Sequence, residues 1–148
     1  MFQIGDKVRI MHQPDLTYVI EGDYDIGDTA TIIALELNNH RIWYQLDVEI
    51  FEEEDQALWR DEDLELVEPS QLQPRYCIGD EVVDISTQDQ PTHTIGRLQI
   101  GEEYGEVEGS LAVTGERVYY YMTRRTTVNY TKAYTEGVLR PLSDYTLF

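Results

Sequence analysis

The stretch Ile4-Gly5-Asp6-Lys7-Val8 and its counterpart Ile78-Gly79-Asp80-Glu81-Val82 decide the fold that the sequence predicts. The two stretches lie 74 residues apart. A second Ile-Gly pair followed by an acid stands 22 residues after each glycine, as Ile26-Gly27-Asp28 and Ile100-Gly101-Glu102. Two landmarks that recur at one spacing indicate a duplicated unit of about 70 residues.

Alternating polar and apolar residues predict short strands in the first unit, because successive side chains of a strand point to opposite faces. The expected strands are 7–11, 29–35, 41–50, 57–60 and a last one anchored by Leu64 and Leu66. A loop is expected over 12–27, and turns at Asn38-Asn39 and 61–63. In the third strand Ile42, Tyr44, Leu46, Val48 and Ile50 should face a core.

The same plan is expected in the second unit. Its predicted strands are 81–86, 104–113, 117–123, 128–134 and 138–142, with a long loop over 88–101 and a hairpin turn at Thr114-Gly115. Val118, Tyr120 and Met122 match Ile42, Tyr44 and Leu46 at an offset of 76. Asp84 stands at the offset of the apolar Ile10, and a β-bulge would turn Val83 and Ile85 inward instead.

The absence of helical periodicity and the number of short strands predict an all-β chain of two tandem five-stranded barrels. The predicted domains are 1–68 and 76–148, joined by a polar, proline-bounded linker at 69–75. The order Gly-Asp-x-Val-x-Ile, long loop, glycine, hairpin and Asp-Leu-x-Leu resembles tandem SH3-like barrels, similar to KOW-related modules of bacteria and phage. Gly105 matches the KOW glycine, whereas the first unit has Ala30 there. The resemblance implies binding of peptides, nucleic acids or proteins through the long loop and neighbouring hairpins.

Few residues offer chemistry for catalysis or metal binding. His12, His40 and His93 lack ligand spacing, and a single cysteine supports no thiolate zinc site. Cys77 adjoins an Ile-Gly turn, which favours a small buried thiol over a nucleophile. Gly101, Gly105 and Gly109 match no phosphate-binding pattern. We therefore expect a protein that is not an enzyme and has no cofactor or metal.

The location of the protein is predicted from what its sequence lacks. No apolar run approaches the roughly 20 residues that span a bilayer. The N-terminal residues carry no basic segment followed by an apolar one, so no secretion signal is expected. A single cysteine suits a reducing compartment. Together these features predict a cytoplasmic protein that does not bind membranes.

Charge is the extreme feature of the sequence, with a formal net value of −18. Residues 1–70 hold 18 acids and 4 bases, and residues 71–148 hold 11 acids and 7 bases. Such a field repels nucleic acid and attracts basic surfaces. With Trp43 on the outward face of its strand and Trp59 just before an acidic turn, the first unit is predicted to bind a basic protein. The candidate partner-binding residues are Trp43, Asp47, Glu49, Glu52, Glu53, Glu54, Asp55, Trp59, Asp61, Glu62 and Asp63.

The sharper hypothesis is nucleic-acid mimicry. In composition the chain resembles small acidic phage inhibitors of restriction or CRISPR nucleases, and immunity proteins that block basic nuclease toxins. Acidity that serves only solubility is the simpler interpretation. A second alternative is direct nucleic-acid binding by a basic and aromatic cluster of the second unit, made of Tyr119, Tyr121, Arg124, Arg125, Tyr130 and Lys132. An assembly subunit is a third possibility.

Overall fold

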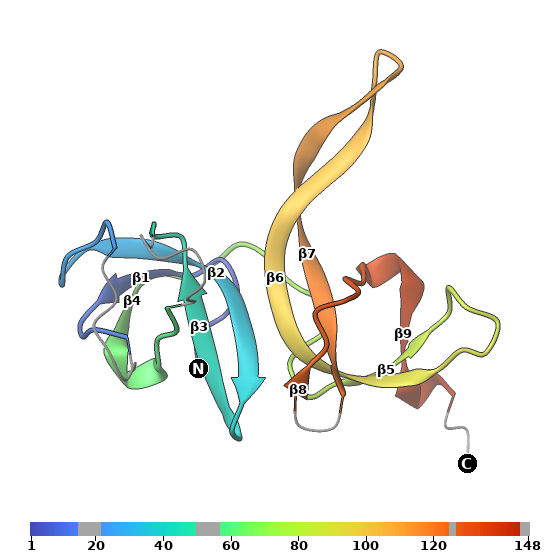
Figure 1. Cartoon of the computed structure of the whole chain (residues 1–148), viewed down its shortest axis with the longest axis horizontal. Coiled ribbons are helices and arrows are strands. Elements are labelled where there is room, and N and C mark those ends of the chain that lie inside the picture. Colours follow the sequence, from blue (N-terminus) through green and yellow to red (C-terminus); the bar gives the residue numbers. More distant parts are fainter. Residues whose placement is uncertain (15–21, 50–56, 125–126, 146–148) are drawn as a thin grey trace. The chain divides into compact units, whose positions relative to one another are not determined.

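The computed structural model describes residues 1–14, 22–49, 57–124 and 127–145 (Figure 1). The chain divides into two compact units, unit 1 at Met1–Gln73 and unit 2 at Pro74–Phe148, and the division falls inside the predicted linker 69–75. The described ranges contain nine strands and three short 3₁₀ helices. The prediction of a mainly β protein is confirmed. No helix within these ranges is long and apolar enough to cross a membrane.

Unit 1 is an antiparallel sheet with the strand order β4-β1-β2-β3. Its strands are β1 (Lys7–Ile10), β2 (Thr29–Asn38), β3 (Arg41–Leu46) and β4 (Leu64–Glu68). The 3₁₀ helix η1 (Asp61–Asp63) precedes β4, and Tyr44 of β3 forms an isolated bridge with Trp59. The last strand therefore lies beside the first. The described strands form an open sheet, and closure into a barrel is not seen in them.

Unit 2 repeats this order as β9-β5-β6-β7, with β8 beside β7. Its elements are β5 (Glu81–Asp84), β6 (Thr92–Val107), β7 (Ser110–Arg124), β8 (Thr127–Val128), η2 (Glu136–Val138), β9 (Leu139–Pro141) and η3 (Leu142–Asp144). A 3₁₀ helix again precedes the closing strand, and Tyr120 bridges Tyr134 as Tyr44 bridges Trp59.

The repeated Ile-Gly-Asp stretch forms the same turn at the start of both units. The Asp6 N–H donates to the Gln3 carbonyl over 3.1 Å, and the Gln3 N–H donates to Asp6 Oδ2 over 2.8 Å. In unit 2 the Asp80 N–H donates to the Cys77 carbonyl over 3.1 Å, and the Cys77 N–H donates to Asp80 Oδ2 over 2.9 Å. Gly5 and Gly79 have φ of 84° and 91°, which L-residues with a side chain rarely adopt. Glycine and aspartate are thus required together at this turn.

The second landmark is not equivalent in the two units. Ile26-Gly27-Asp28 forms a third turn of this kind, with Gly27 at φ 97° and the Asp25 N–H bonded to Asp28 Oδ2. Gly101 instead lies inside β6, opposite Arg117 of β7. The structural counterpart of Thr29-Ala30-Thr31-Ile32 is Thr92-His93-Thr94-Ile95, at an offset of 63, because Gly5 and Gly79 donate to Ile32 and Ile95 respectively.

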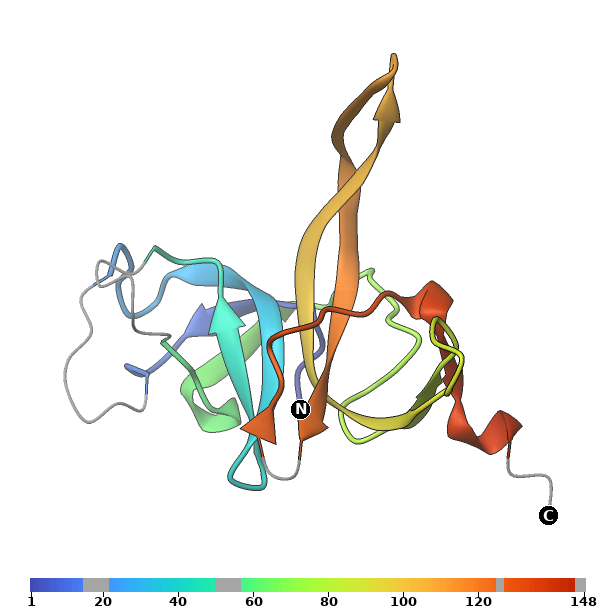
Figure 2. The ribbon, with the colours of Figure 1, turned by 45° about the vertical axis from the view of Figure 1, so that its right-hand side comes forward.

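This correction moves two predicted loops. Residues 88–101 are not a long loop, because β6 begins at Thr92. The hairpin does not turn at Thr114-Gly115 but at Glu108-Gly109, where φ is 51° and 80°. Two successive residues with positive φ match the twist of a two-residue hairpin. Figure 2 shows the resulting long β6–β7 hairpin projecting from the rest of unit 2.

Three predictions about individual strands and side chains are wrong. Asp84 is 1% exposed, and β5 pairs with β9 without a register shift, so no bulge turns it outward. Its carboxylate accepts hydrogen bonds from the Ser86 N–H and hydroxyl, which replace water. Cys77 is exposed rather than buried, because it opens the turn at the position of the exposed Gln3. The third strand ends at Leu46, and Ile50 lies outside the described residues.

A tyrosine from the third strand lies at the centre of each core, and both are fully buried as predicted. The Tyr44 hydroxyl accepts from the Phe2 N–H over 3.0 Å and donates to Asp61 over 2.7 Å. Tyr120 does the same with the Tyr76 N–H (3.4 Å) and Glu136 (3.0 Å). Their rings meet Phe2 and Tyr76 edge to face, with centroids 5.4 and 5.6 Å apart.

We predict that Tyr44→Phe lowers the free energy of unfolding of unit 1 by about 1–3 kcal/mol, because the Phe2 N–H loses its partner. Both tryptophans, Trp43 and Trp59, lie in unit 1, so their fluorescence during urea unfolding reports that unit. Tyr24→Phe removes a hydroxyl of unit 1 that donates to Gln13 in an exposed hydrogen bond, so it is the control and should change little. An equal effect of the two variants would contradict the hydroxyl's role.

Alkaline pH should destabilise both units. Burial is the main cause that raises the pKa of Tyr44 and Tyr120 above the ordinary value of 10.0. Below pH 10 both stay protonated whether folded or unfolded. As pH rises further, only the unfolded chain releases these protons, so stability falls. Absorbance should show at least two tyrosines, Tyr44 and Tyr120, ionising only with unfolding, whereas all eleven titrate together in denaturant.

Candidate protein-docking surface

The described partner-binding candidates do not form one patch in unit 1. Trp43 lies near the start of β3, whereas Asp47 and Glu49 follow its end. From Arg41 to Asp47 an extended strand covers about 20 Å. Two groups of acids result, one around η1 and one beyond the end of β3. Glu52, Glu53, Glu54 and Asp55 lie outside the described residues.

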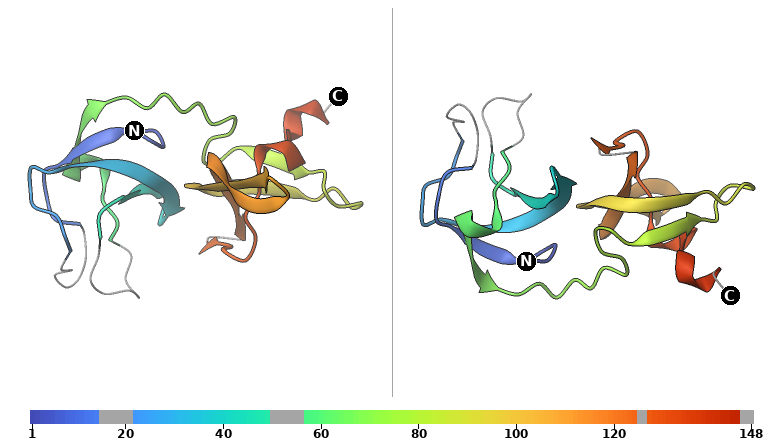
Figure 3. Two further views of the ribbon diagram at one scale, coloured as in Figure 1. Left: turned by 90° about the horizontal axis from the view of Figure 1, so that it is seen from above. Right: turned by 90° about the horizontal axis from the view of Figure 1, so that it is seen from below.

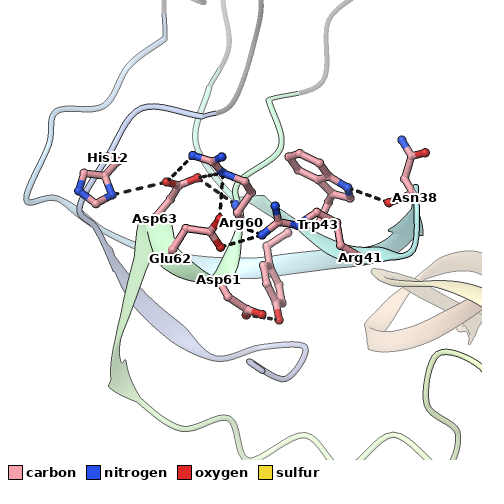
Figure 4. Close-up of polar contacts among 9 residues, drawn as sticks. His12, Asn38, Arg41, Trp43, Arg60, Asp61, Glu62 and Asp63 are labelled. Carbon is pink, nitrogen blue, oxygen red and sulfur yellow. Dashed lines mark hydrogen bonds and ion pairs between the residues drawn. The ribbon is translucent and has the colours of Figure 1, made fainter.

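Two of the three acids of η1, Glu62 and Asp63, are paired with arginines of unit 1 (Figure 4). The Arg60 side chain donates to both Asp63 carboxylate oxygens over 3.1 and 3.2 Å, and its backbone N–H adds a third bond. His12 Nδ1 lies 3.5 Å from the same carboxylate. Burial raises the pKa of Asp63, but the hydrogen bonds and charge of Arg60 outweigh burial and hold the pKa below its usual range. Asp63 is therefore a buried structural anion.

Arg41 neutralises the second acid of the turn. Arg41 Nη2 donates to both Glu62 carboxylate oxygens, over 2.9 Å to Oε1 and 2.7 Å to Oε2. The guanidinium also lies 5.3 Å from the ring centroid of Trp43, whose indole N–H donates to the Asn38 carbonyl over 3.1 Å. A hydrogen bond to the carboxylate from the Glu62 backbone N–H and the bonds from Arg41 lower the pKa of Glu62. Trp43 is consequently half-buried beneath an arginine rather than ringed by free carboxylates.

The predicted exposure of two further candidate residues is wrong. Trp59 was expected beside the acidic turn as an apolar anchor, but it is fully buried, and its indole donates to the His12 carbonyl over 3.2 Å. Asp63 was expected to be exposed, yet it is 1% exposed against Arg60. Trp59 occupies the core because it bridges Tyr44 across the sheet. Neither residue can contact a partner without unfolding this part of unit 1.

The second group is larger than the sequence predicted. The Asp23 N–H donates to the Glu49 carbonyl over 2.8 Å, and Asp47 exchanges two hydrogen bonds with Thr31. These contacts close a ring of backbone made of 23–31 and 47–49. Its exposed carboxylates, here called the acidic rim, belong to Asp23, Asp25, Asp28, Asp47 and Glu49. The first three were missed because only the pairing of distant segments brings them to Asp47 and Glu49.

The bases of unit 1 lie beside other acids. Arg41 and Arg60 bind Glu62 and Asp63. Lys7 and Arg9 of β1 stand opposite Glu68 and Glu65 of β4 in the strand register. Unit 1 has four bases in all. No carboxylate of the acidic rim forms an ion pair with a described base.

The basic and aromatic cluster of unit 2 is only partly assembled. Tyr121 and Tyr130 lie with ring centroids 6.0 Å apart. Lys132 is engaged elsewhere, 3.6 Å from Asp84 Oδ2 and 4.6 Å from the ring centroid of Tyr134. Tyr119 donates to the Glu102 carbonyl over 2.6 Å. The Arg124 side chain and Arg125 lie outside the described residues. The described cluster thus lacks a free lysine for phosphate.

Among the described residues, no three His, Cys, Asp or Glu side chains are grouped so that they could hold a metal ion. No protein-family model matches the chain, and neither a curated protein nor a solved structure matches it. The function is therefore inferred from the protein's own geometry and charge.

We predict that Arg60→Met destabilises unit 1 by about 1–3 kcal/mol at neutral pH, because it leaves the Asp63 carboxylate buried without its cation. In the unchanged protein the lowered pKa stabilises the fold above about pH 4, and this contribution is lost as pH falls through the depressed pKa. In the variant, burial that raises the pKa of Asp63 is opposed only by the backbone N–H of residue 60 and by His12, so the deficit should shrink on acidification.

Urea unfolding followed by tryptophan fluorescence at neutral and mildly acidic pH measures this difference. Arg41→Met, which removes an exposed ion pair, is the matched control and should cost much less. A deficit independent of pH would show that Arg60 acts by packing and not through Asp63.

Proposed function

We propose that this protein is a non-enzymatic binding protein whose unit 1 docks onto a basic protein surface. The observation that carries the proposal is the acidic rim. Its five carboxylates are exposed on one ring of backbone and form no ion pair with a described base, while Arg41 and Arg60 pair with Glu62 and Asp63. Uncompensated charge of one sign attracts and orients a partner of the opposite sign.

We further propose that both units are SH3-like small barrels. Support comes from the shared strand order, the 3₁₀ helix before the last strand, and the pairing of the last strand with the first in each unit. A barrel of this kind presents its loops at one end as a binding surface. In unit 1 the acidic rim includes the end of the loop after β1 and the segment after β3.

The proposed partner is a nucleic-acid-binding protein, such as a restriction or CRISPR nuclease. Asp47 and Glu49 stand two residues apart, about 7 Å in an extended segment. Duplex DNA presents one charge per about 1.7 Å of axis, so the five carboxylates carry the charge of about 8.5 Å of duplex. The protein would then inhibit by occupying the nucleic-acid site.

Charge reversal of the acidic rim tests this function. We predict that Asp23→Lys, Asp25→Lys and Glu49→Lys together weaken inhibition of DNA cleavage, across a panel of basic nucleases, by about tenfold or more. These three are chosen because no described fold contact uses their carboxylates, whereas those of Asp28 and Asp47 accept backbone hydrogen bonds. Inhibition by the unchanged protein should also weaken as salt rises.

The matched control carries Glu81→Lys, Asp89→Lys and Asp144→Lys, three exposed acids of unit 2 with the same change in net charge. It should retain inhibition within about twofold. An equal loss of inhibition in both triple variants would show that net charge, and not the acidic rim, causes the effect. Direct binding of duplex or single-stranded DNA in a gel shift would favour the tyrosine cluster of unit 2 instead.

A further inference from the structure

Unit 2 carries an arm that unit 1 lacks. In unit 1, Leu35 and Tyr44 pair across the hairpin and are 9 positions apart, whereas their counterparts Leu98 and Tyr120 are 22 apart. The extra residues extend β6 and β7 beyond the core, and the arm is defined as residues 102–116. Figure 3 gives the view along the arm, and Figure 2 shows it from the side.

The base of the arm is braced by contacts between its own two strands, β6 and β7. The Tyr119 ring covers the Cα of Gly101, where a Cβ would lie 2.7 Å from the ring. The Tyr119 hydroxyl donates to the Glu102 carbonyl, and Arg117 lies 3.6 Å from Glu103. A register shift at Glu103/Tyr104 then adds local twist. A two-stranded ribbon alone is marginally stable in water, so this bracing holds the arm in place.

The two faces of the arm differ. Tyr104 pairs with Val113, and Glu106 with Leu111, so these four side chains share one face. On it Tyr104 is 57%, Val113 54% and Leu111 77% exposed. The opposite face carries Gly105, Val107, Ser110 and Ala112. An apolar side chain as large and exposed as Leu111, beside two others, is typical of a protein-contact surface.

The negative charge of the arm indicates which kind of partner binds its apolar face. Residues 102–117 contain five glutamates and one base, Arg117. Nucleic acid is repelled by this charge, and a second copy of the arm would bring like charges together. Glu106 stands within the apolar face, opposite Leu111. A partner that covers this face must therefore bring a cation to Glu106 and apolar side chains to Leu111 and Val113.

We propose that the arm is a second docking element, which inserts its Tyr104–Glu106–Leu111–Val113 face into an apolar groove lined by lysine or arginine on a partner protein. This inference does not depend on the acidic rim. The arm supplies apolar contact area at its centre and carboxylates around it, as in interfaces where a desolvated anchor is surrounded by polar groups.

A synthetic peptide of alternating leucine and lysine serves as the probe, titrated into the isotope-labelled full chain and followed by NMR. We expect saturable shifts of the amides of 104–113, weaker at higher salt. Val113→Ser and Val107→Ser form a matched pair on opposite faces, both exposed valines. Val113→Ser should weaken binding about tenfold, and Val107→Ser by less than about twofold.

Other outcomes would overturn the inference. These are equal effects of the two serine variants, equal binding of a leucine–glutamate peptide, or shifts confined to unit 1. Self-association of the unchanged chain in sedimentation, together with loss of that association in Val113→Ser, would assign the face to a second copy of the chain. Asp23→Lys, Asp25→Lys and Glu49→Lys should leave peptide binding to the arm intact, which separates failure of this inference from failure of the acidic-rim proposal.

Discussion

The structure of each unit depends on one buried tyrosine hydroxyl. In unit 1 the Tyr44 hydroxyl of the third strand binds the Phe2 N–H and the Asp61 carboxylate of η1, so it joins three segments that are far apart in the chain. Tyr120 joins the equivalent segments of unit 2 through Tyr76 and Glu136. A buried hydroxyl must be both donor and acceptor to be satisfied, so its partners are fixed in position. These bonds hold the 3₁₀ helix against the core, and the last strand of the unit follows directly from that helix.

Around this shared centre the two units lengthen different connections. Ile10 lies 18 positions before its partner Asp28, whereas Asp84 lies 7 before Pro91, so unit 1 has the longer loop after the first strand. Unit 2 has the longer hairpin. Surface insertions of this kind cost little because loop-closure entropy grows slowly with length. The same core thereby presents an acidic rim in one copy and an apolar, acid-flanked arm in the other.

Local patterns in the sequence predicted strands at 7–11, 29–35, 81–86 and 117–123 and the buried Tyr44, Leu46, Tyr120 and Met122, because period-two alternation reports which side chains share a face. The predicted strands 57–60 and 128–134 are wrong, because only bridges at Trp59 and Tyr134 and the short β8 form there. They failed where long-range pairing decides. Gly101 resembles the turn glycine Gly27 in sequence, but β7 pairs with it and keeps it extended. Burial of Asp63 depends on Arg60, three residues earlier, and that spacing could have revealed it. The acidic rim could not be found, since hydrogen bonds between segments 23–31 and 47–49 create it.

The contacts that complete each unit join its two ends. Asp6 accepts a hydrogen bond from the Ser70 N–H, 64 residues later, and Tyr76 donates to the Leu139 carbonyl, 63 residues later. During synthesis on the ribosome, neither unit can satisfy these groups until nearly all of its residues have emerged. Unit 1 is complete first, and a nascent unit 2 must expose its apolar hairpin while it waits for β9. The glutamates of residues 102–116 give that hairpin a negative charge, which opposes its association with a second copy.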